Sequence, residues 1–178
     1  MNGIASLLDK PAASRVELLW QELEARCGLV GVKAMPLPHF TWQVTEAYEL
    51  SRLETVLHAF ARQTQPFSIH TSGLGLFTSE KPIVYISIVK DEPLLQFHSI
   101  LWDLLKGIAI HPTLYYTPGQ WVPHITLAYQ DVTSANLDCV MQELAFQSFT
   151  WEIQVDNLIV IAQREDQYIE TIRYRLGS

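Results

Sequence analysis

An internal repeat is the feature that most constrains what this chain can fold into. Corresponding places in its two halves read Pro38-His39-Phe40-Thr41-Trp42 and Pro123-His124-Ile125-Thr126-Leu127. Each segment is predicted to be a strand, followed by a helix and two further strands in the same order. Self-similarity of this kind indicates two lobes related by a pseudo-twofold axis. We therefore expect one bilobal α+β domain with two antiparallel sheets, helices on their outer faces and a central cleft.

Hydrophobic spacing and turn residues place the expected elements along a single domain of residues 1–178. An N-terminal helix spans about 14–27, with Ser14 as N-cap, Glu17 in capping-box position and Gly28 as its stop. Lobe one covers about 28–107, with strands at 28–35, 39–45, 67–77 and 82–90 and helices at 47–63 and 92–106. Lobe two covers about 123–176. It follows an aromatic loop at 111–122 and has strands at 124–130, 150–162 and 168–176, a helix at 134–146 and a polar turn at 164–167.

The charge balance restricts the kind of partner. The chain has 12 basic residues against 19 acidic ones, a net charge of −7, and no basic run. Proteins that track long nucleic acids neutralise many phosphates with Lys and Arg, so long duplex nucleic acid is disfavoured and a short RNA or a nucleotide is not. The chain shows no leader and no apolar run of the ~18 residues needed to span a bilayer. We expect a cytoplasmic monomer that binds no membrane.

The two cysteines agree with that location. Cys27 and Cys139 each lie in a predicted helix, and no CxxC spacing occurs. We interpret them as buried apolar thiols in a reducing compartment rather than as a redox pair.

The repeated motif brings together side chains suited to phosphate esters. Residues i and i+2 of a strand share a face, so His39 lies beside Thr41 and His124 beside Thr126, while the intervening and following apolar residues point into the core. Cleavage of a phosphodiester needs a base on the entering oxygen and an acid on the leaving one, and histidine serves either role near neutral pH. The threonine hydroxyls are suited to donating hydrogen bonds to the non-bridging oxygens.

These motifs resemble the two-histidine phosphoesterase superfamily, which includes 2′-5′ RNA ligase-like proteins and cyclic phosphodiesterases. His39, Thr41, His124 and Thr126 match its paired His-x-(Thr/Ser)-x signature position by position, and the resemblance extends from about Gly28 to Leu176. It implies a metal-independent phosphodiesterase without cofactor, which opens a 2′,3′-cyclic phosphate or cleaves or joins a 2′-5′ linkage in short RNA. Trp42, where the family more often has an aliphatic residue, and the scarcity of basic residues are departures. The alternative is a non-catalytic protein that binds a nucleotide or cyclic phosphate in the same cleft.

Several further residues are candidates for substrate contact. Tyr115, Tyr116 and Trp121, in the loop before the second motif, are as suited to stacking on a base as to packing in the core. Gln43 and Gln130 share the predicted face of the motif residues. By the same strand parity, Trp42 and Tyr129 are expected in the core.

The other histidines are not assigned to the acid–base pair, although His111, which lies in the aromatic loop, is as suited to a functional role as to a structural one. His111-Pro112-Thr113 also fits the motif, but Pro112 lacks the N–H that a central strand needs, and nothing in the repeat matches it. His58, His70 and His98 are interpreted as surface or satisfied core residues. The chain has no HExxH, no HxH and no Cys/His cluster with ligand spacing, so we expect no metal site.

Overall fold

The computed structural model describes residues 2–164 and 167–178, and over these residues the fold is α+β. The strands are β1 (Asn2–Leu7), β2 (His39–Tyr48), β3 (Phe67–Phe77), β4 (Ile83–Ile88), β5 (Ala109–Pro112), β6 (His124–Ala128), β7 (Glu152–Val155), β8 (Asn157–Arg164) and β9 (Gln167–Arg175). The helices are α1 (Lys10–Cys27), α2 (Leu50–Gln63), α3 (Glu92–Leu105) and α4 (Leu137–Leu144), with 3-10 turns η1 (Gly31–Ala34) and η2 (Leu114–Tyr116). The expected polar turn at 164–167 lies partly outside the described residues.

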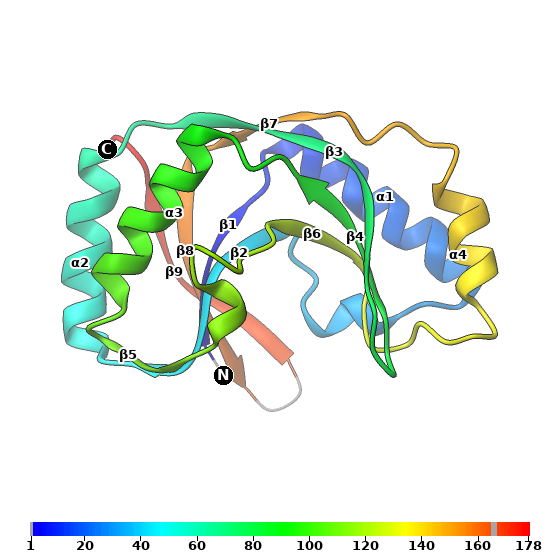
Figure 1. Ribbon diagram of the computed structural model, residues 1–178, viewed down its shortest axis with the longest axis horizontal. Coiled ribbons are helices and arrows are strands. Elements are labelled where there is room, and N and C mark those ends of the chain that lie inside the picture. The colour runs from blue at the N-terminus through cyan, green and yellow to red at the C-terminus, as the bar shows by residue number, and fades with distance from the viewer. Residues whose placement is uncertain (1, 165–166) are drawn as a thin grey trace.

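The two motif strands form the middle of a curved antiparallel sheet. Its strand order is β7-β3-β4-β6-β2-β1-β8-β9, with β5 paired to β2. Strands β2 and β6 pair where Phe40 lies opposite Ile125. On one side of this junction β6 pairs with β4, and on the other β2 pairs with β1 (Figure 1). The sheet thus has two halves that meet at the two motifs.

The repeat begins earlier than the sequence analysis predicts, because strand β1 was not expected. Strand β1 precedes α1 and pairs with β2, just as β4 precedes α3 and pairs with β6. The repeat unit is therefore β1-α1-β2-α2-β3, followed by β4-α3-β6-α4-β8. The last strands are exchanged between the repeats, since β3 pairs with β4 and β8 pairs with β1. The expected lobes at 28–107 and 123–176 consequently do not coincide with the halves of the sheet, each of which takes strands from both.

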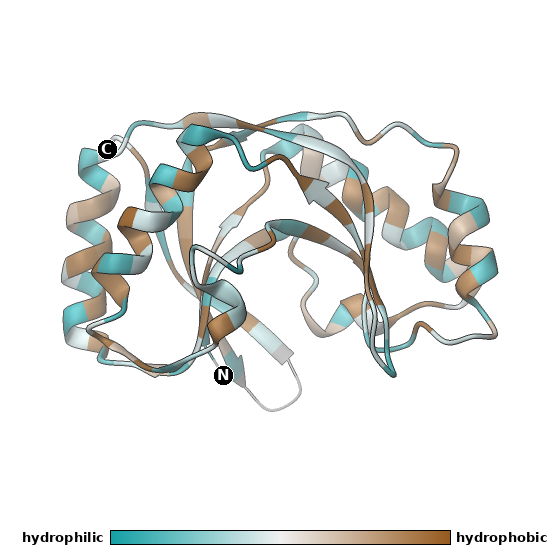
Figure 2. Ribbon diagram, in the orientation of Figure 1, coloured by the Kyte–Doolittle hydropathy of each residue, from teal (hydrophilic) through white to brown (hydrophobic). Residues whose placement is uncertain are grey.

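Two pairs of helices cover the two halves of the sheet. Helices α1 and α4 contact each other, and α1 contacts β6; α2 and α3 contact each other and strands β2, β8 and β9. Figure 1 shows these pairs at opposite ends of the molecule, and Figure 2 shows the apolar stripes along them. In α2 the buried stripe is Leu53, Leu57 and Ala61, whose removal from water favours this packing. No helix among the described residues combines the length and the apolar character needed to cross a bilayer.

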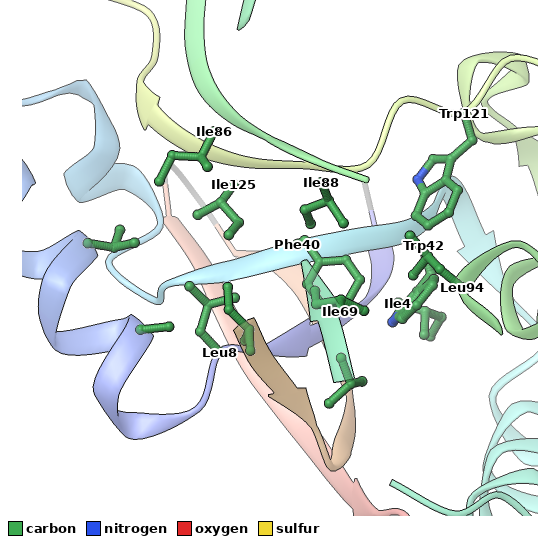
Figure 3. Packing of buried hydrophobic residues seen from close by; sticks show 14 of the residues in the cluster. Ile4, Leu8, Phe40, Trp42, Ile69, Ile86, Ile88, Leu94, Trp121 and Ile125 are labelled. Atoms are coloured by element: carbon green, nitrogen blue, oxygen red, sulfur yellow. The ribbon is translucent and has the colours of Figure 1, made fainter. Parts of the chain in front are cut away.

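The apolar residues of both motifs are in the core, as strand parity predicts. Phe40, Trp42, Ile125 and Leu127 are each at most 1% exposed. Figure 3 shows the first three packed around β2 together with residues of neighbouring strands. Their burial fixes the register of both strands, because a shift by one residue would exchange the core and cavity faces.

The first helix begins at Lys10, four residues before Ser14, the predicted N-cap. Asp9 is its N-cap and accepts a hydrogen bond from the Ala12 N–H at 2.9 Å. Pro11 occupies the first turn, where its missing N–H has no helical partner to lose. Ser14 therefore lies inside the helix, and its predicted capping role is wrong. Gly28, with φ of 72°, ends the helix as predicted.

The strand expected at 28–35 is not formed, and turn η1 takes its place. The N–H groups of Val30 and Gly31 donate to one carboxylate oxygen of Asp131 at 2.6 and 2.7 Å. A side chain thus satisfies backbone donors that the prediction assigned to a sheet. A Cβ atom on Gly31 would lie 1.7 Å from the Tyr129 carbonyl oxygen, so this close approach requires glycine.

Two further segments differ from expectation. The predicted loop at 111–122 starts inside the short strand β5, where Pro112 lies opposite Thr45 of β2. The single strand expected at 150–162 is divided at Asp156 into β7, which pairs with β3, and β8, which pairs with β1. Both differences depend on pairing with strands distant in the sequence.

The cysteines are not free thiols. Cys27 at the end of α1 and Cys139 in α4 form a disulfide with a Cα–Cα distance of 5.8 Å. The interpretation as two buried thiols is therefore wrong, because packing of α1 against α4 brings together residues 112 positions apart. This pairing also removes one of the observations on which the expected cytoplasmic location rested.

Candidate active site

The structure brings both motifs to a single cavity of about 310 Å³. Strand β2 contributes His39 and Thr41, and β6 contributes His124 and Thr126. The other lining residues come mainly from strands beside the motifs and from the segments around η1 and η2; they are Asn2, Gly3, Trp20, Val32, Ala34, Met35, Val44, Ile83, Thr113, Tyr116, Tyr129, Ile161 and Tyr168. The two imidazole and hydroxyl pairs predicted from the sequence therefore share one site.

The two imidazoles have the same hydrogen-bond arrangement. Nδ1 of His39 lies 2.5 Å from the Leu37 carbonyl oxygen, and Nδ1 of His124 lies 2.7 Å from that of Val122. A carbonyl oxygen only accepts, so Nδ1 carries the hydrogen in both rings. No described residue bonds Nε2 of either ring. Each neutral imidazole consequently presents an unprotonated Nε2, which accepts a proton as a base and, once protonated, donates it as an acid.

Burial makes both imidazoles poor cations in the free protein. Desolvation is the main cause that lowers the pKa of His39 to about 4, and the nearby His124 lowers it further, against the opposing effect of the Leu37 carbonyl. Desolvation likewise lowers the pKa of His124. Both rings are therefore neutral at pH 7, and an anion bound between them would favour protonation of one.

A β-bulge in each motif strand decides which residues beyond the threonines reach the cavity. In β1, Ala5 lies opposite Thr41 and the next residue, Ile4, lies opposite Gln43, so Trp42 is the extra residue of β2. Such a bulge reverses the alternation of faces beyond it. Gln43 is accordingly 1% exposed and accepts a hydrogen bond from the Tyr48 hydroxyl at 2.9 Å. The predicted contact of Gln43 with substrate is wrong, and Val44 lines the cavity instead.

Strand β6 contains the equivalent bulge. Tyr85 of β4 lies opposite Thr126, and Val84 lies opposite Ala128, so Leu127 is the extra residue. Tyr129 therefore lines the cavity, although strand parity places it in the core. Gln130 follows the end of β6 with φ of 74° and is exposed outside the cavity. Gln130 is thus not among the described residues that line the cavity, and its contact with substrate stays a prediction.

The three aromatic residues predicted before the second motif have three different environments. Trp121 is 1% exposed and stacks on His98, with ring centroids 3.8 Å apart, so it packs in the core. Tyr115 is 77% exposed and outside the cavity lining. Tyr116 alone of the three lines the cavity. Periodicity could not separate them, because the loop has no regular face.

Two further tyrosines accompany Tyr116. Tyr129 and Tyr168 line the same cavity. Burial, followed by the proximity of these two phenols, raises the pKa of Tyr116 to about 12. Burial likewise raises the pKa of Tyr168, so the hydroxyl groups of Tyr116 and Tyr168 are neutral at pH 7 and able to donate hydrogen bonds. Tyr168, Trp20 and Asn2 were missed in the sequence because β1, α1 and β9 reach the cavity only through tertiary packing.

The described residues that line the cavity offer polar groups but no fixed charge. None of its described lining residues is Lys, Arg, Asp or Glu. In the described part of the chain, no group of three or more His, Cys, Asp and Glu side chains is placed to hold a metal ion. The polar groups available to a substrate are thus imidazoles, hydroxyls and an amide.

The third HxT segment contributes only its threonine. His111 is exposed, has φ of 53° and bonds Glu46 through Nδ1 at 2.8 Å. Thr113 nevertheless lines the cavity, because β5 pairs with the far end of β2.

Of the other histidines, His58 and His70 are exposed, as expected for surface residues. His98 is buried, and its Nε2 lies 3.1 Å from the Trp42 carbonyl oxygen.

A family model and curated relatives match most of the sequence. The family model of the 2′-5′ RNA ligase superfamily matches residues 9–167. A Bacillus mycoides (strain KBAB4) protein named "Putative phosphoesterase" is 25% identical over 136 residues, which cover 75% of this chain and 74% of that protein.

Solved structures share the fold. TT0787 of Thermus thermophilus superposes with a TM-score of 0.64 at 18% identity, covering 99% of this chain and 97% of that chain. LigT of E. coli complexed with 3′-AMP gives a TM-score of 0.61 at 15% identity, covering 99% and 98%. Since the family model matches most of the sequence, the chain belongs to the 2′-5′ RNA ligase superfamily, a family of two-histidine phosphoesterases.

Proposed function

We propose that the protein is a metal-independent phosphodiesterase that acts on an RNA-type phosphate ester, with His39 and His124 as an acid–base pair. The observation that carries the proposal is the equivalence of the two imidazoles. Each donates Nδ1–H to the carbonyl two residues before it and leaves Nε2 without a partner among the described residues, at the same cavity. A displacement at phosphorus needs one such group on each side.

The reaction assigns a separate role to each ring. One neutral imidazole takes a proton from a water molecule as its oxygen bonds to phosphorus. The other, protonated, gives its proton to the ribose oxygen as the bond from that oxygen to phosphorus breaks. A 2′,3′-cyclic phosphate is thereby opened to a monoester. Attack by a 5′-hydroxyl in place of water yields a 2′-5′ linkage, and the reverse cleaves it.

The substrate supplies the charge that the free site lacks. Both imidazoles are neutral before binding because burial lowers their pKa values. A phosphodiester carries one negative charge, and its presence favours the imidazolium that the mechanism requires. Hydrogen bonds from Thr41 and Thr126 to the non-bridging oxygens would then stabilise the charge that develops in the transition state.

The proposed ligands are short. LigT of E. coli has been crystallised with 3′-AMP and with NADP+, which are small nucleotide ligands. A cavity of about 310 Å³ is of the size that holds one such group. We propose a nucleoside 2′,3′-cyclic phosphate, or the end of a short RNA, as the substrate.

The test is hydrolysis of the four nucleoside 2′,3′-cyclic phosphates in excess EDTA. We expect turnover by the wild type, and a loss of roughly 10²- to 10⁴-fold in His39→Ala and in His124→Ala. The double variant should lose less than the sum of the two free-energy costs because the residues act together. His111→Ala, which removes an exposed imidazole outside the cavity, is the matched control and should retain wild-type turnover.

Two results would contradict the proposal. Loss of activity in EDTA with recovery in Mn²⁺ or Zn²⁺ would mean that a metal ion performs the chemistry. Tight binding of a cyclic phosphate without any turnover would favour the alternative of a nucleotide-binding protein.

A further inference from the structure

The backbone carbonyl of each motif threonine accepts a hydrogen bond from the side chain of a tryptophan. The indole Nε1–H of Trp121 donates to the carbonyl oxygen of Thr41 at 2.9 Å. The indole Nε1–H of Trp20 donates to the carbonyl oxygen of Thr126 at 3.1 Å. The two acceptors, Thr41 and Thr126, occupy equivalent positions of the repeat. The two donors do not, because Trp20 lies in α1 and Trp121 lies after η2.

The course of the two motif strands explains why these carbonyls accept from side chains. In the described part of the chain, β2 and β6 pair at one position, Phe40 opposite Ile125. Beyond it each strand has its bulge, at Trp42 and Leu127, and the ladder between β2 and β6 stops. Pairing between β2 and β6 therefore does not continue at Thr41 and Thr126, although Thr41 still pairs with β1 and Thr126 with β4. The two threonine carbonyls accept from indole N–H groups instead, which satisfies them where water is excluded.

Both indoles are themselves fixed in place. Trp121 is buried and stacks on two rings, with its centroid 3.8 Å from that of His98 and 5.3 Å from that of Trp42. Figure 3 shows Trp121 and Trp42 close together beside β2. Trp20 is held by α1, which the Cys27–Cys139 disulfide ties to α4. Rigid donors of this kind lose little entropy when they bond.

We propose that Trp20 and Trp121 are positioning residues that aim the hydroxyl groups of Thr126 and Thr41 at the phosphate. The inference rests on the proposed function for its kinetic consequences. The indoles act on the threonine peptides and leave the bonds of His39 and His124 to the Leu37 and Val122 carbonyls untouched. They therefore affect stabilisation of the transition state and not proton transfer.

The kinetic test deletes each indole N–H and keeps its ring. Replacement of Trp121 or Trp20 by 3-benzothienylalanine does this with almost no change of volume, and W121F and W20F are simpler second variants. We expect kcat to fall roughly 5- to 30-fold, as for the loss of one hydrogen bond in the transition state, with KM nearly unchanged and both pH limbs unmoved. Trp151→Phe is the matched control, because its indole donates to the Ser148 carbonyl at 3.0 Å, outside the cavity.

A double-mutant cycle shows whether the indole acts through its threonine. In a Thr41→Ala background, the change at Trp121 should cause little further loss of kcat, and the same should hold for Trp20 in a Thr126→Ala background. Fully multiplicative losses in both cycles would overturn the proposal. So would benzothienyl variants with wild-type kcat.

A spectroscopic measurement separates this inference from the proposed function. The indole hydrogens of Trp20 and Trp121 should exchange with solvent more slowly than that of Trp102, whose indole N–H has no hydrogen-bond partner among the described residues. The ¹³C shift of the Thr41 carbonyl should move when the N–H of Trp121 is deleted and stay when that of Trp20 is deleted. Failure of these two results overturns the inference, whereas a wild type that turns over no cyclic phosphate overturns the proposed function.

Discussion

Removal of the Cys27–Cys139 disulfide is expected to lower the stability of the fold substantially. The bond joins the end of α1 to α4 across 112 positions of a 178-residue chain. A cross-link between residues so distant restricts the unfolded ensemble far more than the folded one. The perturbation is the double substitution Cys27→Ala/Cys139→Ala, or reduction of the wild-type protein with a phosphine.

The magnitude follows from the length of the closed loop. With 112 positions between the cysteines, the chain-entropy relation gives a loss of about 16 cal/mol/K, or about 5 kcal/mol at 25 °C. Measured values for native disulfides are about 2–5 kcal/mol, so we expect the free energy of unfolding to fall by roughly 3–5 kcal/mol. At about 2–4 °C per kcal/mol for a chain of this size, Tm should fall by roughly 6–20 °C.

Urea unfolding followed by circular dichroism, with and without reductant, measures the effect. The wild-type midpoint should move in reductant to that of the double variant, whereas the variant's own midpoint should not respond. The m-value should rise on reduction, because the unfolded chain without its cross-link exposes more surface. An unchanged midpoint on complete reduction, or two thiols that react freely in the native protein, would refute the reasoning.

Two further predictions concern the site. Burial lowers the pKa of His39 to about 4 and also lowers that of His124, so in the free enzyme the imidazole that must be protonated loses its proton below pH 6.5. The plot of kcat/KM against pH should therefore be a bell with its optimum below pH 6.5. The basic limb of the kcat profile should lie at higher pH, because the bound phosphate favours the imidazolium. Initial rates from pH 4 to 9 check this, and a flat profile would contradict it. A Cβ at Gly31 would lie 1.7 Å from the Tyr129 carbonyl oxygen whereas one at Gly107 meets nothing within 4 Å, so Gly31→Ala should lose about 1–3 kcal/mol or more in stability and also lose activity, while Gly107→Ala changes neither. Chemical unfolding and turnover of both variants compare them, and equal behaviour would exclude this role for Gly31.

Most elements and the two motifs are predictable from local patterns. The amphipathic helices, the strand pair β3–β4 and the pairing of each histidine with a threonine depend on residues near one another in the sequence. Hydrophobic periodicity gave wrong predictions for segments whose pairing strand or hydrogen-bond acceptor is distant in the sequence. Strand β1 exists through its pairing with β2 and β8, and the segment 28–35 forms a turn because Asp131 satisfies its backbone donors.

The sequence by itself determined that two His-x-Thr strands each place an imidazole beside a hydroxyl group, because the period of two in a strand puts His39 with Thr41 and His124 with Thr126 on the same face. Only the tertiary structure decided the surroundings of those four side chains. Bulges at Trp42 and Leu127 send Gln43 inward and bring Tyr129 to the cavity, and packing of α1 on α4 pairs the cysteines. The physical reason is that a bulge or a cross-link is a relation between two segments distant along the chain, and the local pattern of either segment alone does not contain it.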